Sequence, residues 1–167
     1  MVIRITTHRA NSLSNKTLSR LLELTIDASR GDYVDDGDRN FTVESVLADI
    51  LSERIAGLKP FNKKAHIVCA RIGAKIVGWA LIGPAWLINR TGVMLYIDPE
   101  HRRHGLGNKI IDASKEIARS KFKSDRLVAA PWNASSRSFF VRNGFVSDRN
   151  LLPSLVSFAV QQLSVVA

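Results

Sequence analysis

A short basic loop with two glycines carries the residues whose types and spacing suggest chemistry. It reads Arg102-Arg103-His104-Gly105-Leu106-Gly107, follows a strand-like run that ends at Asp98-Pro99, and leads into a helix-like sequence. A helix N-terminus directs several backbone N–H groups, and the positive end of its dipole, toward one place. Glycine has no Cβ atom and adopts positive φ readily, so a phosphate can approach the backbone closely. The loop therefore predicts a site for a pyrophosphate group.

Two common nucleotide-binding patterns fit this loop poorly. The dinucleotide pattern Gly-x-Gly-x-x-Gly would need its first glycine at Arg102, and the strand before the loop lies in mid-chain. The Walker pattern is absent, because no Gly-Lys is followed by Ser or Thr. These mismatches weaken the case for a nucleotide as the ligand.

The positive charge of the chain is concentrated in the part that contains the loop. The formal net charge is +9. Residues 1–60 contain eight basic and nine acidic residues, whereas residues 61–167 contain sixteen and six, a net charge of +10. Such a field attracts a polyphosphate ligand, an acidic protein or nucleic acid. A merely solubilising surface is the simpler alternative.

The elements that must position the loop alternate between helix and strand patterns along the chain. No repeat, linker or low-complexity segment divides it, so we expect one domain over residues 1–167 with an α/β fold, a mixed sheet and the order βααβββαβαββ. The expected strands are Val2–Thr7, Ala65–Ile72, Lys75–Ile82, Val93–Ile97, Arg126–Ala130, a run from Phe145 onward, and Val156–Val160. The expected helices are Ser14–Ser29, Thr42–Gly57, Gly105–Lys121 and Ala134–Asn143.

Composition excludes several kinds of site. The single cysteine, Cys69, excludes an internal disulfide and a cysteine-based zinc site, and its strand-like surroundings indicate a buried thiol. We expect no metal. No apolar run approaches the ~20 residues of a membrane span, and the N-terminus has no leader pattern. A cytoplasmic protein, monomeric or homodimeric, is therefore expected.

A second motif makes the ligand specific. The run from Ile97 to Gly107 resembles motif A of the Gcn5-related N-acetyltransferase (GNAT) family, which has Arg or Gln, two residues, Gly, one residue, then Gly or Ala. The run from Asn133 to Phe145, with an asparagine, an aromatic-bearing helix and a closing Gly-Phe, resembles motif B of the same family. The resemblance covers nearly the whole chain and implies a mostly antiparallel central sheet flanked by helices, with acetyl-coenzyme A (acetyl-CoA) as acyl donor.

The resemblance also implies roles for particular residues. The backbone of Leu95, Tyr96 and Ile97 would pair with the pantetheine arm, and Phe140 would pack near the thioester. Asn133 would contact the pantetheine or the start of its helix. Lys109 and Arg142 are candidates for the 3′-phosphate region or are ordinary surface charges. The residues that would hold the pyrophosphate are Arg102, Arg103, His104, Gly105, Leu106, Gly107 and Asn108.

The chain departs from the family where protons are handled. Many members have a tyrosine that protonates the departing thiolate, and the aligned residue here is Phe140, which has no proton to give. A general acid is worth ~10²–10⁴-fold, so transfer does not strictly need one when the leaving group is a thiolate. Tyr96 is the best substitute, and a packed aromatic is its alternative role. The run Arg90–Leu95 contains no carboxylate to act as base.

Three functions remain open from the sequence. The first is acetyl transfer to an amine of a small molecule or protein by direct attack in a ternary complex. A cationic acceptor would suit the acidic segment of Asp32, Asp35, Asp36 and Asp38, which is otherwise a solvated loop. The second, less favoured, is transfer to an RNA-linked amine such as an aminoacyl-tRNA. RNA binding would use the basic residues Lys115, Arg119, Lys121, Lys123 and Arg126. The third is a regulator that binds CoA without turnover.

Overall fold

Alternating apolar residues and one tight turn build the centre of the molecule. The computed structural model describes residues 2–32, 65–85, 90–131, 133–147 and 156–159. Within them, the expected hairpin turns at Gly73, whose φ of 57° suits a residue without a Cβ atom. The strands are β1 (Ile3–Arg9), β2 (His66–Ile72), β3 (Lys75–Ala85), β4 (Arg90–Ile97), β5 (Arg126–Ala129) and β6 (Val156–Ala159). The helices are α1 (Asn15–Asp32), α4 (Leu106–Ser120) and α5 (Ala134–Arg142), with 3₁₀ turns η1 (Ala10–Ser12) and η2 (Pro99–His101).

The described strands form one sheet in the order β1-β2-β3-β4-β5-β6. Every neighbouring pair is antiparallel except β4 and β5, which run parallel. The connection between those two strands is α4, as parallel neighbours require a crossover. The expected mixed and mostly antiparallel α/β fold is therefore confirmed.

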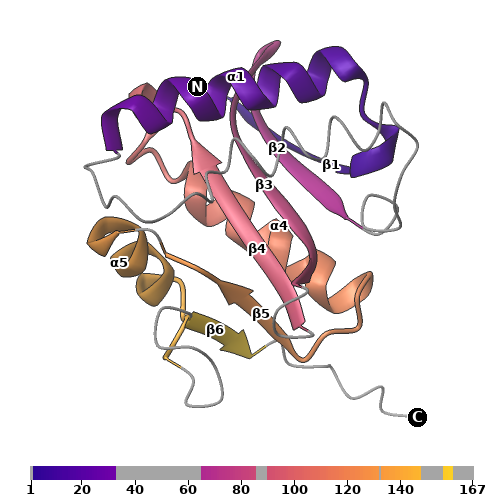
Figure 1. Ribbon diagram of the computed structural model, residues 1–167, viewed down its shortest axis with the longest axis vertical. Helices are drawn as coiled ribbons and strands as arrows, with labels where there is room; N and C mark the ends of the chain where they lie inside the picture. The colour runs from indigo at the N-terminus through magenta and orange to yellow at the C-terminus, as the bar shows by residue number, and fades with distance from the viewer. Residues whose placement is uncertain (1, 33–64, 86–89, 132, 148–155, 160–167) are drawn as a thin grey trace.

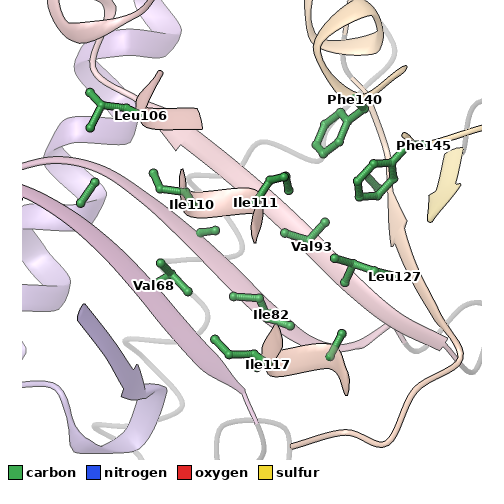
Figure 2. Close-up of a cluster of buried hydrophobic side chains, with 14 of the residues drawn as sticks. Val68, Ile82, Val93, Leu106, Ile110, Ile111, Ile117, Leu127, Phe140 and Phe145 are labelled. Atoms are coloured by element: carbon green, nitrogen blue, oxygen red, sulfur yellow. The ribbon is translucent and has the colours of Figure 1, made fainter. Parts of the chain in front are cut away.

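Two apolar clusters lie on the sheet, one on each face, and α1 and α4 lie on opposite sides of the sheet (Figure 1). Alternate residues of β2 face opposite sides, so Val68 joins the cluster under α4 while Cys69 joins the cluster under α1. Figure 2 shows Ile110, Ile111 and Ile117 of α4 in the first cluster with the strand residues. Burial of these faces positions β4 and α4 against each other.

One of the expected elements differs in the structure, and another lies outside the described residues. The run from Phe145 is not a strand where the structure describes it, because only Val146 forms a bridge, with Ser157 of β6. Its two backbone hydrogen bonds measure 2.8 and 2.9 Å, so pairing is real but limited to one residue. The predicted helix Thr42–Gly57 lies outside the described residues.

No helix in the described part of the chain has the length and apolarity to cross a membrane.

Candidate functional site

The two edges of β4 are paired to different extents. The β3 edge is paired from Arg90 to Ile97, whereas β5 pairs only with Thr91, Gly92 and Val93. Beyond Val93 the two strands move apart, toward the arrowhead of β4 in Figure 1. The last residues of β4 therefore have one main-chain edge with which no described strand pairs, and the region beside this edge is called the opening below.

Strand alternation shows which residues line this opening. The amide of Asp98 donates to the carbonyl of Val77 in β3 at 3.0 Å, so the residues two apart from Asp98 also direct their main-chain groups at β3. The Tyr96 carbonyl accordingly lies beside Gly78. The main-chain N–H and carbonyl groups of Leu95 and Ile97 point the other way, into the opening. Of the three residues predicted to pair with a ligand arm, these two have the suitable orientation.

A short capped turn joins β4 to the loop. The Asp98 carboxylate accepts from the amide of Glu100 at 3.2 Å and starts η2, with Pro99 at its first position. It also pairs with Lys75 at 3.5 Å and with His101 at 3.3 Å. Asp98, Glu100 and His101 lie close enough together to hold an ion. The hydrogen bond from Glu100 and the ion pair with Lys75 nevertheless give the Asp98 carboxylate a structural role in the turn.

The predicted basic loop has two parts, one that hydrogen-bonds back to β4 and one that is exposed. The Arg102 side chain folds back, and its Nε donates to the carbonyl of Ile97 at 3.1 Å. Arg103, His104 and Gly105 are exposed, and Arg103 has a φ of 65°, which is unusual for a residue with a Cβ atom. Arg102 thus stabilises the turn, while the side chains of Arg103 and His104 face solvent.

Gly105 ends the loop as the N-cap of α4, with a φ of 75°. A Cβ atom placed there would meet nothing within 4 Å, so the space above the helix start is open. The amides of Leu106, Gly107 and Asn108 begin the helix and have no acceptor one turn earlier within it. Leu106 is buried and fixes this first turn to the core. Together these groups can hold an anion such as pyrophosphate.

Helix α5 lies against that first turn. Its N-cap is Asn133, whose Oδ1 accepts from the Ser136 amide at 2.8 Å, while the Ser136 hydroxyl accepts from the Asn133 amide at 3.0 Å. This reciprocal pair is a capping box. Asn133 therefore has the helix-start contact, one of the two roles predicted for it.

The sequence pattern of the Acetyltransferase (GNAT) family matches residues 32–145, more than half of the chain. The chain belongs to the GNAT acetyltransferase family. Its two motifs are the β4-loop-α4 unit and α5, which the structure brings together. No curated protein matches the chain by sequence.

Solved structures share the GNAT fold with this chain at low sequence identity. A GNAT-family acetyltransferase from Staphylococcus aureus Mu50 has a TM-score of 0.69 at 16% identity, covering 96% of this chain and 100% of that one. PaiA N-acetyltransferase from Thermoplasma acidophilum, solved with coenzyme A, has 0.64 at 17%, covering 95% and 99%. YncA from Salmonella typhimurium, solved with its cofactor acetyl-CoA, has 0.62 at 15%, covering 96% of each chain.

The aromatic residue of GNAT motif B is a core residue here. Phe140 is 6% exposed, and its ring packs edge-on against Phe139 and Phe145 at centroid distances of 5.3 and 5.0 Å. Figure 2 shows Phe140 and Phe145 together at the border of the α4 cluster. Phe139, which the sequence did not single out, contacts the start of α4 instead.

Two side chains tie α5 to α4, and the sequence predicted neither contact. The Nδ2 of Asn143 donates to the Oδ1 of Asn108 at 3.3 Å. The Nζ of Lys115 donates to the carbonyl of Asn143 at 2.9 Å and lies 4.0 Å from the ring centroid of Phe158. Lys115 was predicted as a contact for RNA phosphates, but its ammonium group caps the end of α5.

The opposite face of β4 carries the predicted catalytic residue. Tyr96 packs with Met94 against the α1 cluster, directly across from the fully buried Trp79 of β3. Its hydroxyl oxygen is buried. This confirms that Tyr96 faces away from Leu95 and Ile97, while its role in proton transfer stays a prediction.

The remaining candidates are inert or lie elsewhere. Burial raises the pKa of the Cys69 thiol to about 11, although the positive charge of Arg71 lowers it in part, so this thiol is a poor nucleophile. Asp32 is the last residue of α1, and its side chain is not described. Asp35, Asp36 and Asp38 lie outside the described residues.

Proposed function

We propose that this protein is an acetyl-CoA-dependent N-acetyltransferase whose acceptor is an amine of a small molecule or protein. The observation that carries the proposal is the separation of β4 from β5 after Val93, followed along the chain by a helix start whose first amides have no partner within the helix. One edge of β4 can accept an extended amide-bearing arm as an added strand, and the helix start can accept its diphosphate. Two such features at this spacing suit CoA better than a nucleotide alone.

The described residues fit such a ligand. Leu95 and Ile97 direct main-chain groups into the opening, where the pantetheine amides would bind. The amides from Arg103 to Asn108 would hold the pyrophosphate, with no Cβ atom at Gly105 to obstruct it. Exposed Lys109 and Arg142 are candidates for the 3′-phosphate.

The chain's own contribution to the reaction is positioning and polarisation. When bound, acetyl-CoA supplies a thioester whose C–S bond breaks as the amine nitrogen forms the new C–N bond. The N–H of Leu95 or Ile97 would donate to the carbonyl oxygen as its negative charge grows. Tyr96 would donate its hydroxyl proton to the leaving sulfur and regain one from the attacking amine through water. The acceptor amine must be neutral to attack, so activity should rise with pH until acceptor amines are deprotonated.

An acidic segment and a basic surface bear on the choice of acceptor. The acidic residues Asp32, Asp35, Asp36 and Asp38 would favour a cationic amine or basic peptide. Because Lys115 is engaged with α5 and Phe158, one of the five cations of the RNA-linked alternative serves the fold instead. The predicted cytoplasmic location and monomeric or homodimeric state belong to this proposal too.

A regulator that binds CoA without turnover is the second candidate, and Phe140 favours it. The residue that should donate a proton is a buried phenylalanine. Phe140→Tyr would restore the family's hydroxyl at that position. A non-catalytic regulator would bind acetyl-CoA yet release no thiol from any acceptor, before or after this change.

The deciding experiment measures binding and turnover separately. Calorimetry with acetyl-CoA tests binding, and a thiol reagent follows CoA release with a panel of small amines and basic peptides. The single cysteine is buried, so the protein adds little background to the thiol assay. Release that depends on both an amine and the protein supports the enzyme. Failure to bind acetyl-CoA would overturn the proposal.

A further inference from the structure

The second glycine of the basic loop meets a side chain rather than open space. A Cβ atom at Gly107 would lie 2.7 Å from Cε2 and 3.0 Å from Cζ of Phe139, and 3.1 Å from Cδ1 of Ile97. At Gly105, two residues earlier, the same atom would meet nothing within 4 Å. The two glycines therefore have different reasons to lack a side chain. Gly105 leaves room above the helix start, whereas Gly107 accommodates the ring of Phe139.

A second contact lies one turn further along α5. Asn143 follows Phe139 by four residues, so both side chains lie on the same face of the chain's helical path. The Asn143 Nδ2 donates to Oδ1 of Asn108, the residue after Gly107, at 3.3 Å and to the carbonyl of Phe139 at 2.9 Å. One face of α5 and its C-cap thus contacts two consecutive residues in the first turn of α4.

The other side of α5 is anchored in the core. Phe140 is buried and packs against both Phe139 and Phe145. Lys115, two turns along α4, holds the C-terminal end of α5 through the carbonyl of Asn143. The Phe139 ring therefore contacts Gly107 from a helix that Phe140 and Lys115 anchor to the core and to α4.

From these contacts we infer that Phe139 is a positioning residue, which holds the first turn of α4 through Gly107 so that its amides converge on the pyrophosphate. The inference rests on the proposed acetyl-CoA function. The Gly107 amide is itself one of the donors, and Ile97, the third member of the contact, lines the opening beside β4. A shift of this turn would misdirect several donors together.

A size-exchange experiment tests the inference. Gly107→Ala adds a methyl group where Phe139 stands, and should weaken acetyl-CoA binding roughly tenfold, since overpacking displaces backbone. Phe139→Leu removes ring atoms from the same place. The double variant Gly107→Ala with Phe139→Leu should bind within about threefold of Phe139→Leu alone.

Gly105→Ala is the matched control. It strains a residue with φ of 75° in open space, so Phe139→Leu should not restore its binding. Urea unfolding of each variant gives the folded fraction to which affinities are referred. If Gly107→Ala does not fold, the comparison of the double variant with Phe139→Leu still reads the contact.

Three results would overturn the inference. Gly107→Ala could bind acetyl-CoA as tightly as the unchanged protein, the double variant could bind about tenfold more weakly than Phe139→Leu alone, or Phe139→Leu could restore the binding of Gly105→Ala. The first two results would mean that the second glycine acts on the ligand directly or not at all. The third would mean that the effect of Phe139 does not pass through Gly107. Failure of the unchanged protein to bind acetyl-CoA is a separate result and would remove the proposed function as well.

Discussion

β4 shows one face to α4 and α5 and the other to α1, and the two faces are equipped differently. On the first, Leu95 and Ile97 lie beside the opening, and the loop and first turn of α4 follow directly in the chain. On the second, Tyr96 is held against a packed layer with Trp79. The face proposed for ligand binding thus comes from residues close together in the chain and would use several main-chain groups. The face proposed for proton transfer depends on one hydroxyl group.

The largest expected effect is on the binding face. Gly105→Glu places a side chain at a left-handed residue and a carboxylate at the proposed pyrophosphate site. Backbone strain of ~1–2 kcal/mol and like-charge repulsion of several kcal/mol at close range should weaken acetyl-CoA binding about 1,000-fold. Calorimetry measures the loss.

Gly73→Glu is the control for that change. Gly73 also has positive φ and open space around its Cβ position, but it lies in the β2–β3 turn. It should lose similar stability and keep its affinity for acetyl-CoA. Equal loss of affinity in both variants would contradict the assignment of the loop.

The second largest effect should fall on the opposite face. Tyr96→Phe removes the proposed acid and should lower kcat roughly 100-fold, with the KM for acetyl-CoA within about threefold. Met94→Leu alters the same packed layer without removing a hydroxyl group and should change kcat little. Similar kcat values for Tyr96→Phe and the unchanged protein would leave Tyr96 as a packing residue.

The thiol of Cys69 reports how well the α1 face is sealed. Because the pKa is raised to about 11 from an ordinary 9.0, the thiolate fraction at pH 8 falls about 100-fold relative to the unfolded chain. Alkylation by iodoacetamide at pH 8, followed by mass spectrometry, should be slower by at least this factor in the native protein than in urea. The native rate should increase as the pH rises from 9 to 11. Equal rates in buffer and urea would show that this face opens readily.

The smallest expected effect concerns the tie between α4 and α5. Lys115→Met removes the hydrogen bond to Asn143 and the contact with Phe158, and should lower the free energy of unfolding by about 1–2 kcal/mol. Lys121→Met, at an exposed position, should change it by less than about 0.5 kcal/mol. A selective loss of tRNA binding in Lys115→Met would instead support the RNA-linked alternative.

Local patterns explain what the sequence predicted well. The start of α4 at a glycine, the turn at Gly73 and the opposite orientations of Tyr96 and Ile97 depend on residues close together in the chain. Helix and strand periodicity sufficed for the described strands and α-helices, although not for the 3₁₀ turns η1 and η2, and two motifs sufficed for the family. These features need no knowledge of distant contacts.

The features that sequence reasoning missed all depend on packing between distant residues. Gly107 and Phe139 are far apart in the chain, and both glycines were expected to serve the phosphate. Lys115 looked like a surface cation until its partner at Asn143 was known. The run from Phe145 has a strand-like pattern, yet β6 pairs with it at one residue only within the described residues. Residue type and spacing do not show which side chain of another element packs against a given residue.

The contact between Gly107 and Phe139 also has an evolutionary consequence. If the ring, rather than the ligand, excludes a side chain at Gly107, the two positions should vary together among relatives. Proteins with alanine at the position of Gly107 should have a smaller residue than phenylalanine at the position of Phe139, while the position of Gly105 varies independently of both. The size of one side chain in motif B would then decide which residues natural selection can accept in motif A.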